Sequence, residues 1–102
     1  MKEGYYGCDC GSVGVKCGDN LILYPNGIGD GGYDVYEFES EEEFNSWSGN
    51  KHNNHFISAA TFRGAKVVEY DCDINSREVF ELNGRYGIYC HDGDVYFVKW
   101  ED

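Results

Sequence analysis

Three of the five cysteines lie close together near the N-terminus, at Cys8, Cys10 and Cys17. Cys8 and Cys10 are two residues apart, so a strand would direct both thiols to the same side, and a turn before Cys17 could bring the third thiol beside them. Three thiolates and a histidine would suit tetrahedral zinc. Structural zinc sites, however, usually contain paired C-x-x-C motifs, which this sequence lacks. We therefore expect reduced thiols that pack without a metal, and we keep a zinc-binding module built on these three cysteines as the alternative.

Two short segments match ligand-binding signatures in spacing only. The segment 27–32, GIGDGG, has the glycine spacing of a dinucleotide-binding loop, but the residues after it predict a strand where that loop requires a helix. The segment 71–76, DCDINS, begins like a calcium loop, but a leucine stands where the bidentate glutamate belongs. His91 directly follows Cys90, so a strand would point the two side chains to opposite faces. We expect no catalytic residues, no cofactor and no enzyme activity.

The composition is that of one folded and strongly acidic domain. The 102 residues fit a single domain, 1–102, and 17% aromatic residues are more than an acidic disordered chain would have. The net charge of -11 repels nucleic-acid phosphates and anionic membranes, whereas it attracts basic protein surfaces. Residues 1–10 lack the apolar run of a secretion signal, and no segment of the sequence is apolar for long enough to span a membrane. We therefore expect a cytoplasmic protein with a basic protein as its partner.

The C-terminal third predicts three paired strands. The dipeptides Asn83-Gly84 and Asp92-Gly93 separate segments rich in β-branched and aromatic residues, as two-residue hairpin turns do. They predict an antiparallel three-stranded meander with strands at 79–82, 85–90 and 95–100.

Further strands and one short helix are expected upstream. The predicted strands are 20–24, 33–38, 56–62 and 65–72, the last two joined by a turn at Arg63-Gly64. Ser40 followed by Glu43 is a capping box, which predicts a short helix near residues 41–48 that must pack Phe44 and Trp47 onto the sheet. The predicted fold class is therefore α+β and mainly β, with an antiparallel sheet, a C-terminal meander and one short helix.

The most unusual feature is the charge distribution between Cys17 and Asn50. This segment contains no lysine or arginine, and its acids alternate with aromatic residues. One interpretation is a solvated acidic face that keeps the protein soluble. The other is a docking surface whose carboxylates imitate the spaced phosphates of a nucleic acid. The residues selected for that surface are Asp30, Asp34, Tyr36, Glu37, Glu39, Glu41, Glu42, Glu43 and Trp47.

In size, charge and lack of a catalytic motif, the chain is similar to the inhibitors that phages and mobile elements encode against nucleic-acid-handling defence enzymes, such as anti-CRISPR proteins. It is similar in the same way to immunity proteins that neutralise a nuclease toxin. This resemblance implies a stoichiometric inhibitor that occupies the basic nucleic-acid-binding surface of a partner protein, and it assigns no role to any single residue. A generic protein-interaction domain is the further alternative.

Overall fold

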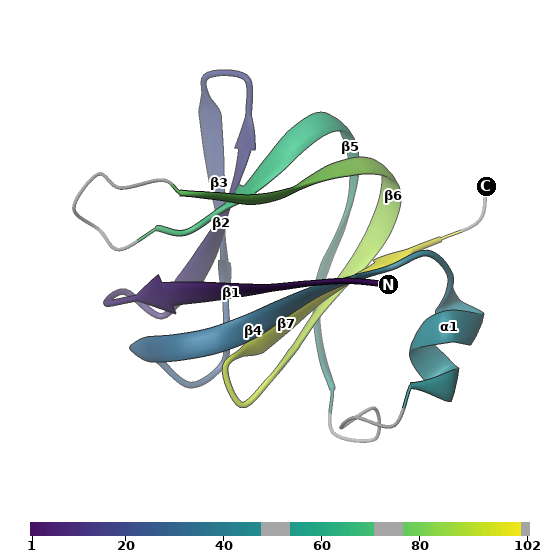
Figure 1. Ribbon diagram of the computed structural model, residues 1–102, viewed down its shortest axis with the longest axis horizontal. Coiled ribbons are helices and arrows are strands. Elements are labelled where there is room, and N and C mark those ends of the chain that lie inside the picture. Colours follow the sequence, from purple (N-terminus) through teal and green to yellow (C-terminus); the bar gives the residue numbers. More distant parts are fainter. Residues whose placement is uncertain (48–53, 71–76, 101–102) are drawn as a thin grey trace.

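The computed structural model of the chain describes residues 1–47, 54–70 and 77–100. In chain order, the elements in these ranges are β1 (Lys2–Cys8), β2 (Ser12–Cys17), β3 (Asn20–Pro25), β4 (Gly31–Phe38), α1 (Glu41–Ser46), β5 (His55–Val68), β6 (Glu78–His91) and β7 (Asp94–Lys99) (Figure 1). The strands predicted at 20–24 and 33–38 are β3 and β4. Helix α1 is too short to cross a membrane, and these ranges contain no longer helix.

The seven strands form one mixed sheet that curls into a half-barrel, in the order β1-β4-β7-β6-β5-β2-β3 (Figure 1). All neighbouring strands are antiparallel except β4 and β7, which run parallel with Val35 opposite Val95. The prediction of an antiparallel sheet is therefore wrong for this pair. A parallel pair needs a long crossover connection, and the chain from α1 through β6 provides it.

Two long strands, β5 and β6, replace the two short hairpins that the sequence predicts. β5 continues through Arg63-Gly64 and β6 through Asn83-Gly84, so neither dipeptide reverses the chain. Arg63 pairs with Asn83, and the register shifts between Arg63 and Ala65. The Gly64 N–H donates to Asn83 Oδ1 at 2.7 Å, and both glycines have positive φ. These turn-forming residues therefore bend a pair of long strands at a bulge instead of closing hairpins.

The hairpin predicted at Asp92-Gly93 is confirmed. It joins β6 to β7 with His91 opposite Asp94. Asp92 and Gly93 have φ values of 48° and 95°, the positive angles that a two-residue turn of this kind requires. The Tyr6 hydroxyl donates to the Gly93 carbonyl oxygen at 2.6 Å and so attaches β1 to this turn. The predicted meander is therefore present only in its C-terminal half.

Two apolar layers stabilise the sheet. The interior of the half-barrel is filled by side chains from all seven strands: Tyr6, Cys8, Val13, Val15, Tyr24, Val35, Phe62, Ala65, Val67, Leu82, Tyr86, Ile88, Cys90, Val95 and Phe97. The outer layer covers β4 and β7 and contains Tyr36, Phe38, Tyr96 and Val98, with Phe44 from α1. Successive residues of β4 thus point alternately into the barrel and towards the helix.

Candidate protein-binding surface

Helix α1 begins with the capping arrangement that the sequence predicts. The Ser40 hydroxyl accepts from the Glu43 N–H at 3.0 Å, and Glu43 Oε1 accepts from the Glu39 N–H at 3.1 Å. The glutamate thus reaches one residue further back than in the usual capping box. The predicted helix 41–48 is observed over Glu41–Ser46 and ends at Trp47, while residue 48 lies outside the described part of the chain.

Tyr36 and Trp47, both selected for the surface, belong to the outer apolar layer. Tyr36 is only 7% exposed, with ring centroids 5.0 Å from Trp47 and 5.5 Å from Tyr96. Burial, together with the charges of Asp34 and Asp94, raises the pKa of Tyr36 to about 12. The Trp47 side chain is half-buried against the same aromatic rings. These two aromatic residues hold α1 on the sheet rather than forming an exposed contact surface.

Glu37 points into the half-barrel and is only 2% exposed. Its Oε2 accepts from the Tyr86 hydroxyl at 2.5 Å, and its Oε1 lies 3.6 Å from Lys2 Nζ, an ion pair longer than a hydrogen bond. Burial and this carboxylate raise the pKa of Tyr86 well above its ordinary value. The side chain is therefore a core group, and the strand alternation that places Val35 inside already indicates this.

Asp30 directly precedes β4, and Asp34 lies in the middle of that strand. The Asp34 N–H donates to Asp94 Oδ1 at 3.0 Å, and the Tyr36 hydroxyl donates to Asp34 Oδ2 at 3.3 Å. Phe38, the last residue of β4, is about 13 Å further along the strand from Asp34. The predicted acidic surface is therefore divided, because these two aspartates lie before and within β4 whereas the four glutamates lie beyond its last residue.

The four glutamates around α1 form the helix-end acidic surface, defined as Glu39, Glu41, Glu42 and Glu43. Two of them have structural partners: Glu39 Oε2 lies 3.4 Å from Lys99 Nζ, and Glu43 Oε2 lies 3.4 Å from the N-terminal amine. Glu41 and Glu42 are exposed, and neither forms an ion pair with any of the described residues.

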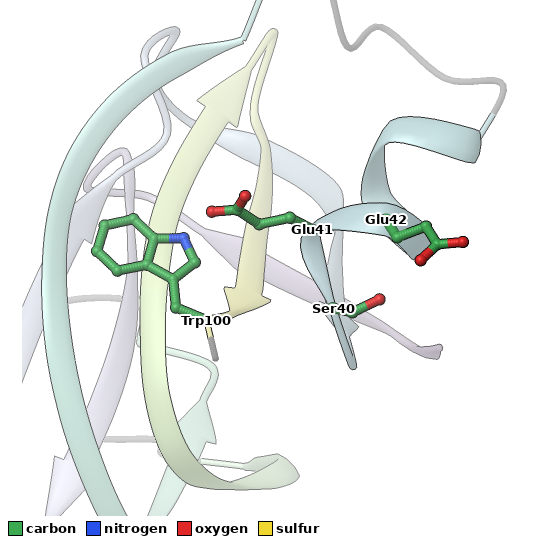
Figure 2. Close-up of a pocket in the computed structure, with 4 residues that line it drawn as sticks. All are labelled: Ser40, Glu41, Glu42 and Trp100. Atoms are coloured by element: carbon green, nitrogen blue, oxygen red, sulfur yellow. The ribbon is translucent and has the colours of Figure 1, made fainter. Parts of the chain in front are cut away.

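A hollow of about 440 Å³ opens beside these two residues, lined by Ser40, Glu41, Glu42 and Trp100. Figure 2 shows the Glu41 carboxylate extended towards the Trp100 indole, whereas the Glu42 carboxylate points to the other side of the helix. Trp100 was not predicted as a site residue. Trp100 directly follows β7, and its indole lies against Gly87 of β6. The other residues of the hollow, Ser40, Glu41 and Glu42, are distant from it in sequence.

The three N-terminal cysteines have separate surroundings. Cys8 is buried beside Asn26, whose Nδ2 lies 3.7 Å from its sulfur, while the Cys10 thiol donates to the Tyr70 carbonyl oxygen at 3.4 Å. Cys17 ends β2 and is half-buried. Cys8, Cys10 and Cys17 are free thiols. Across residues 1–47, 54–70 and 77–100, no three His, Cys, Asp or Glu side chains come together as metal ligands would. Cys72 and the segment 71–76 lie outside these ranges.

A second hollow, of about 410 Å³, contains groups that resemble a nucleophilic site. It is lined by Asn26, Gly27, His55, Cys90, His91 and Asp92, and the strand pairing places His55 opposite Cys90. Burial raises the pKa of the Cys90 thiol, which therefore stays protonated at neutral pH, the reverse of an activated nucleophile. His91 Nε2 lies 3.2 Å from Asp92 Oδ2. His52 lies outside the described residues.

Comparisons with known proteins do not assign the chain to a family. No protein-family model, curated protein or solved structure matches it.

Proposed function

We propose that this protein is a small acidic binding protein that docks its helix-end acidic surface on a basic surface of a partner protein. The observation that supports this most directly is the pair of exposed glutamates, Glu41 and Glu42, beside the hollow that contains Trp100. The hollow has room for a lysine or arginine side chain, which would meet the Glu41 carboxylate and an apolar wall formed by the indole.

The structural roles of the neighbouring acids make this pair distinctive. Glu43 caps the helix, and Glu39 pairs with Lys99. Elsewhere, Glu81 lies 3.0 Å from Lys66 Nζ. Glu41 and Glu42 form no such ion pair among the described residues, and their charges stabilise only the first turn of α1, by about 0.3 to 1 kcal/mol each. Replacing them therefore alters mainly the surface, and the fold of the variant has to be checked. In a complex, Glu41 and Glu42 could each form an ion pair with a basic side chain of the partner, shielded from water.

The partner that best fits this charge is a nucleic-acid-handling enzyme in the cytoplasm. A groove that attracts phosphates also attracts clustered carboxylates, and a protein with net charge -11 is repelled by nucleic acid itself. The protein then acts as a stoichiometric inhibitor of the anti-CRISPR or nuclease-immunity type. It occupies the enzyme's basic surface and excludes its nucleic acid.

The test is affinity capture followed by competition. The wild-type chain and the variant Glu41→Lys/Glu42→Lys serve as parallel baits, and Asp9→Lys/Glu78→Lys is the matched control because both of its residues are exposed and its net charge changes equally. We expect wild type and control to retain the same basic protein, the helix-end variant to lose it, and rising salt to weaken the complex. The nucleic acid of the captured enzyme should displace the bait.

Two outcomes would contradict the proposal. The folded helix-end variant could retain the same partner as strongly as wild type. Alternatively, the captured enzyme could bind nucleic acid and this protein together without mutual interference. Circular dichroism of each bait establishes that the variants are folded before the comparison is made.

A further inference from the structure

The two edges of the sheet differ in how their backbone groups are occupied. At the β1 edge, Glu69 Oε1 accepts from the Gly7 N–H at 2.6 Å, and Arg77 Nη2 donates to the Tyr5 carbonyl oxygen. Glu69 and Arg77 also form an ion pair, with 3.5 Å between Arg77 Nε and Glu69 Oε2. Side chains therefore cap the β1 edge, and an added strand would have to displace them.

The other edge, β3, presents three consecutive aliphatic side chains to solvent. Leu21, Ile22 and Leu23 are 43%, 39% and 43% exposed. Within the described ranges, β3 is the last strand of the sheet and has β2 as its only neighbour. The strand has no charged side chain and no bulge, two of the usual means of preventing edge-to-edge pairing, and its proline, Pro25, stands only at its last residue. In Figure 1, the β2–β3 hairpin extends away from α1.

The register of the β2–β3 hairpin determines which backbone groups of β3 are free. Cys17 lies opposite Asn20 across a two-residue turn, so these two residues form the hydrogen-bonded pair that closes the hairpin. Alternate residues of an antiparallel strand bond to the same neighbour, so Leu21 and Leu23 direct their N–H and C=O groups away from β2. Pro25, next in that series, has no N–H and limits the free ladder to these two leucines.

We propose that β3 pairs antiparallel with β3 of a second copy of this chain, around a two-fold axis at Ile22. In this register, Leu21 of each copy faces Leu23 of the other as a hydrogen-bonded pair, and the two Ile22 residues meet on the axis as a non-hydrogen-bonded pair. All free N–H and C=O groups of the two leucines then find partners. A shift by one residue would align these groups with residues that already bond to β2.

The charge of the hairpin favours a second copy over a basic partner. Residues 12–25 contain only Lys16 and Asp19 as charged groups, so this hairpin is neutral in a chain of net charge -11. Two copies that meet at this neutral hairpin experience less electrostatic repulsion than they would if they met through the acidic surfaces. Salt screens the remaining repulsion and should strengthen the dimer, whereas it should weaken docking by the helix-end acidic surface. The two proposals can therefore fail independently.

The first experiment is sedimentation equilibrium of the full chain from about 10 μM to about 1 mM, because an interface this small gives a weak and reversible dimer. The average mass should rise from 11.6 kDa towards twice that value, and more steeply at high salt. A mass that stays at that of the monomer over the whole range overturns the proposal.

Two variants test the edge itself. Leu23→Pro removes the outward N–H without removing a bond to β2, and Leu23→Lys places charge against the facing strand. Both should remain monomeric while keeping the wild-type circular dichroism spectrum. Glu3→Gln is the control for Leu23→Lys, because it changes the net charge equally at an exposed position on β1, and it should dimerise like wild type. Dimerisation of the folded Leu23 variants to the wild-type extent overturns the proposal.

Cysteine cross-linking tests the register. Residues that face each other as a non-hydrogen-bonded pair are close enough for a disulfide, so Ile22→Cys should form a covalent dimer under mild oxidation. Leu21→Cys is the control, because in this register residue 21 of one copy faces residue 23 of the other, so the two introduced cysteines are not opposite each other. The wild-type chain measures the background cross-linking by the native thiols. Two outcomes would contradict the register: Leu21→Cys could cross-link as fast as Ile22→Cys, or neither variant could cross-link faster than the wild-type chain.

Discussion

The Glu37 carboxylate and the Tyr86 hydroxyl meet inside the half-barrel, with 2.5 Å between Glu37 Oε2 and the hydroxyl oxygen. Both residues are buried, and the ion pair with Lys2 reaches the other carboxylate oxygen at 3.6 Å. A buried carboxylate requires such contacts, since its desolvation is costly. Glu37 is therefore a core residue, although it lies in the middle of the acidic segment.

Tyr86→Phe should lower the free energy of unfolding by about 2 kcal/mol, because the variant leaves a buried carboxylate without its hydroxyl donor. Urea denaturation measures the loss. Tyr5→Phe is the matched control, since Tyr5 is 56% exposed and its change should have little effect. Equal stability of Tyr86→Phe and wild type would show that the hydroxyl does not stabilise the carboxylate.

Ser40→Ala should lower the free energy of unfolding by about 1 kcal/mol, because it removes the side-chain acceptor for the Glu43 N–H at the start of α1. Thermal or urea unfolding provides the measurement. Ser46→Ala is the control within the same helix. The Ser46 hydroxyl donates to the Glu42 carbonyl oxygen, a hydrogen bond that contributes less to the stability of the helix than the cap does. Equal losses in the two variants would argue against a capping role.

Asp94→Asn should gain stability relative to wild type as the pH rises from about 3 to about 7. Burial, with the charges of Asp34 and Asp92, raises the pKa of the Asp94 carboxyl above its ordinary value of 3.8. The folded protein therefore holds this proton more tightly than the unfolded chain does. Stability from this group is present below pH 3.8 and is lost as the pH rises through the folded pKa.

The asparagine removes that titration and keeps an acceptor for the Asp34 N–H. Urea denaturation of Asp94→Asn and wild type at several pH values measures the difference, with Asp9→Asn as the control at an exposed aspartate. A difference in stability that does not change with pH would contradict the assignment to Asp94.

Gly87→Ala should displace the Trp100 indole, because a Cβ at residue 87 would lie 2.5 Å from a Trp100 ring carbon. We expect a loss of about 1 to 2 kcal/mol in the free energy of unfolding, as overpacking usually costs. Tryptophan fluorescence follows the change in environment, and Trp100→Phe identifies which indole responds. The control Ala59→Gly tests the neighbouring strand, since Ala59 pairs with Gly87 and is exposed. Unchanged fluorescence and stability in Gly87→Ala would contradict this packing.

Local sequence signals predicted the local structure well. The Asp92-Gly93 turn and the Ser40 cap each depend on contacts within a few residues, and each is present. The segments of β3 and β4 were recognised from their residue types, and both are strands. Asn83-Gly84 carries the same local signal as Asp92-Gly93 but lies in mid-strand. Its conformation is decided by pairing with Arg63-Gly64 on another strand, and the sequence around either dipeptide contains no information about that pairing.

Which of the candidate residues are exposed was predicted less well, because contacts between distant segments decide it. Glu37 and Tyr36 occupy alternate faces of β4, and both faces are covered, one by the barrel interior and one by α1. An acidic residue on a strand that is covered on both faces is buried, although its charge alone predicts that it is exposed. Trp100 joins Glu41 only because β7 pairs beside β4, and a parallel pair has no local turn signal.

The parallel pairing of β4 with β7 also constrains folding during synthesis. β7 is synthesised after β4, β5 and β6, so Tyr36 and Phe38 on β4 have no β7 partner until that strand has left the ribosome. β5 and β6 are complete earlier and can pair first. A nascent or shortened chain without 94–100 therefore exposes an aromatic surface, and exposed apolar surface of this kind makes a folding intermediate prone to aggregation.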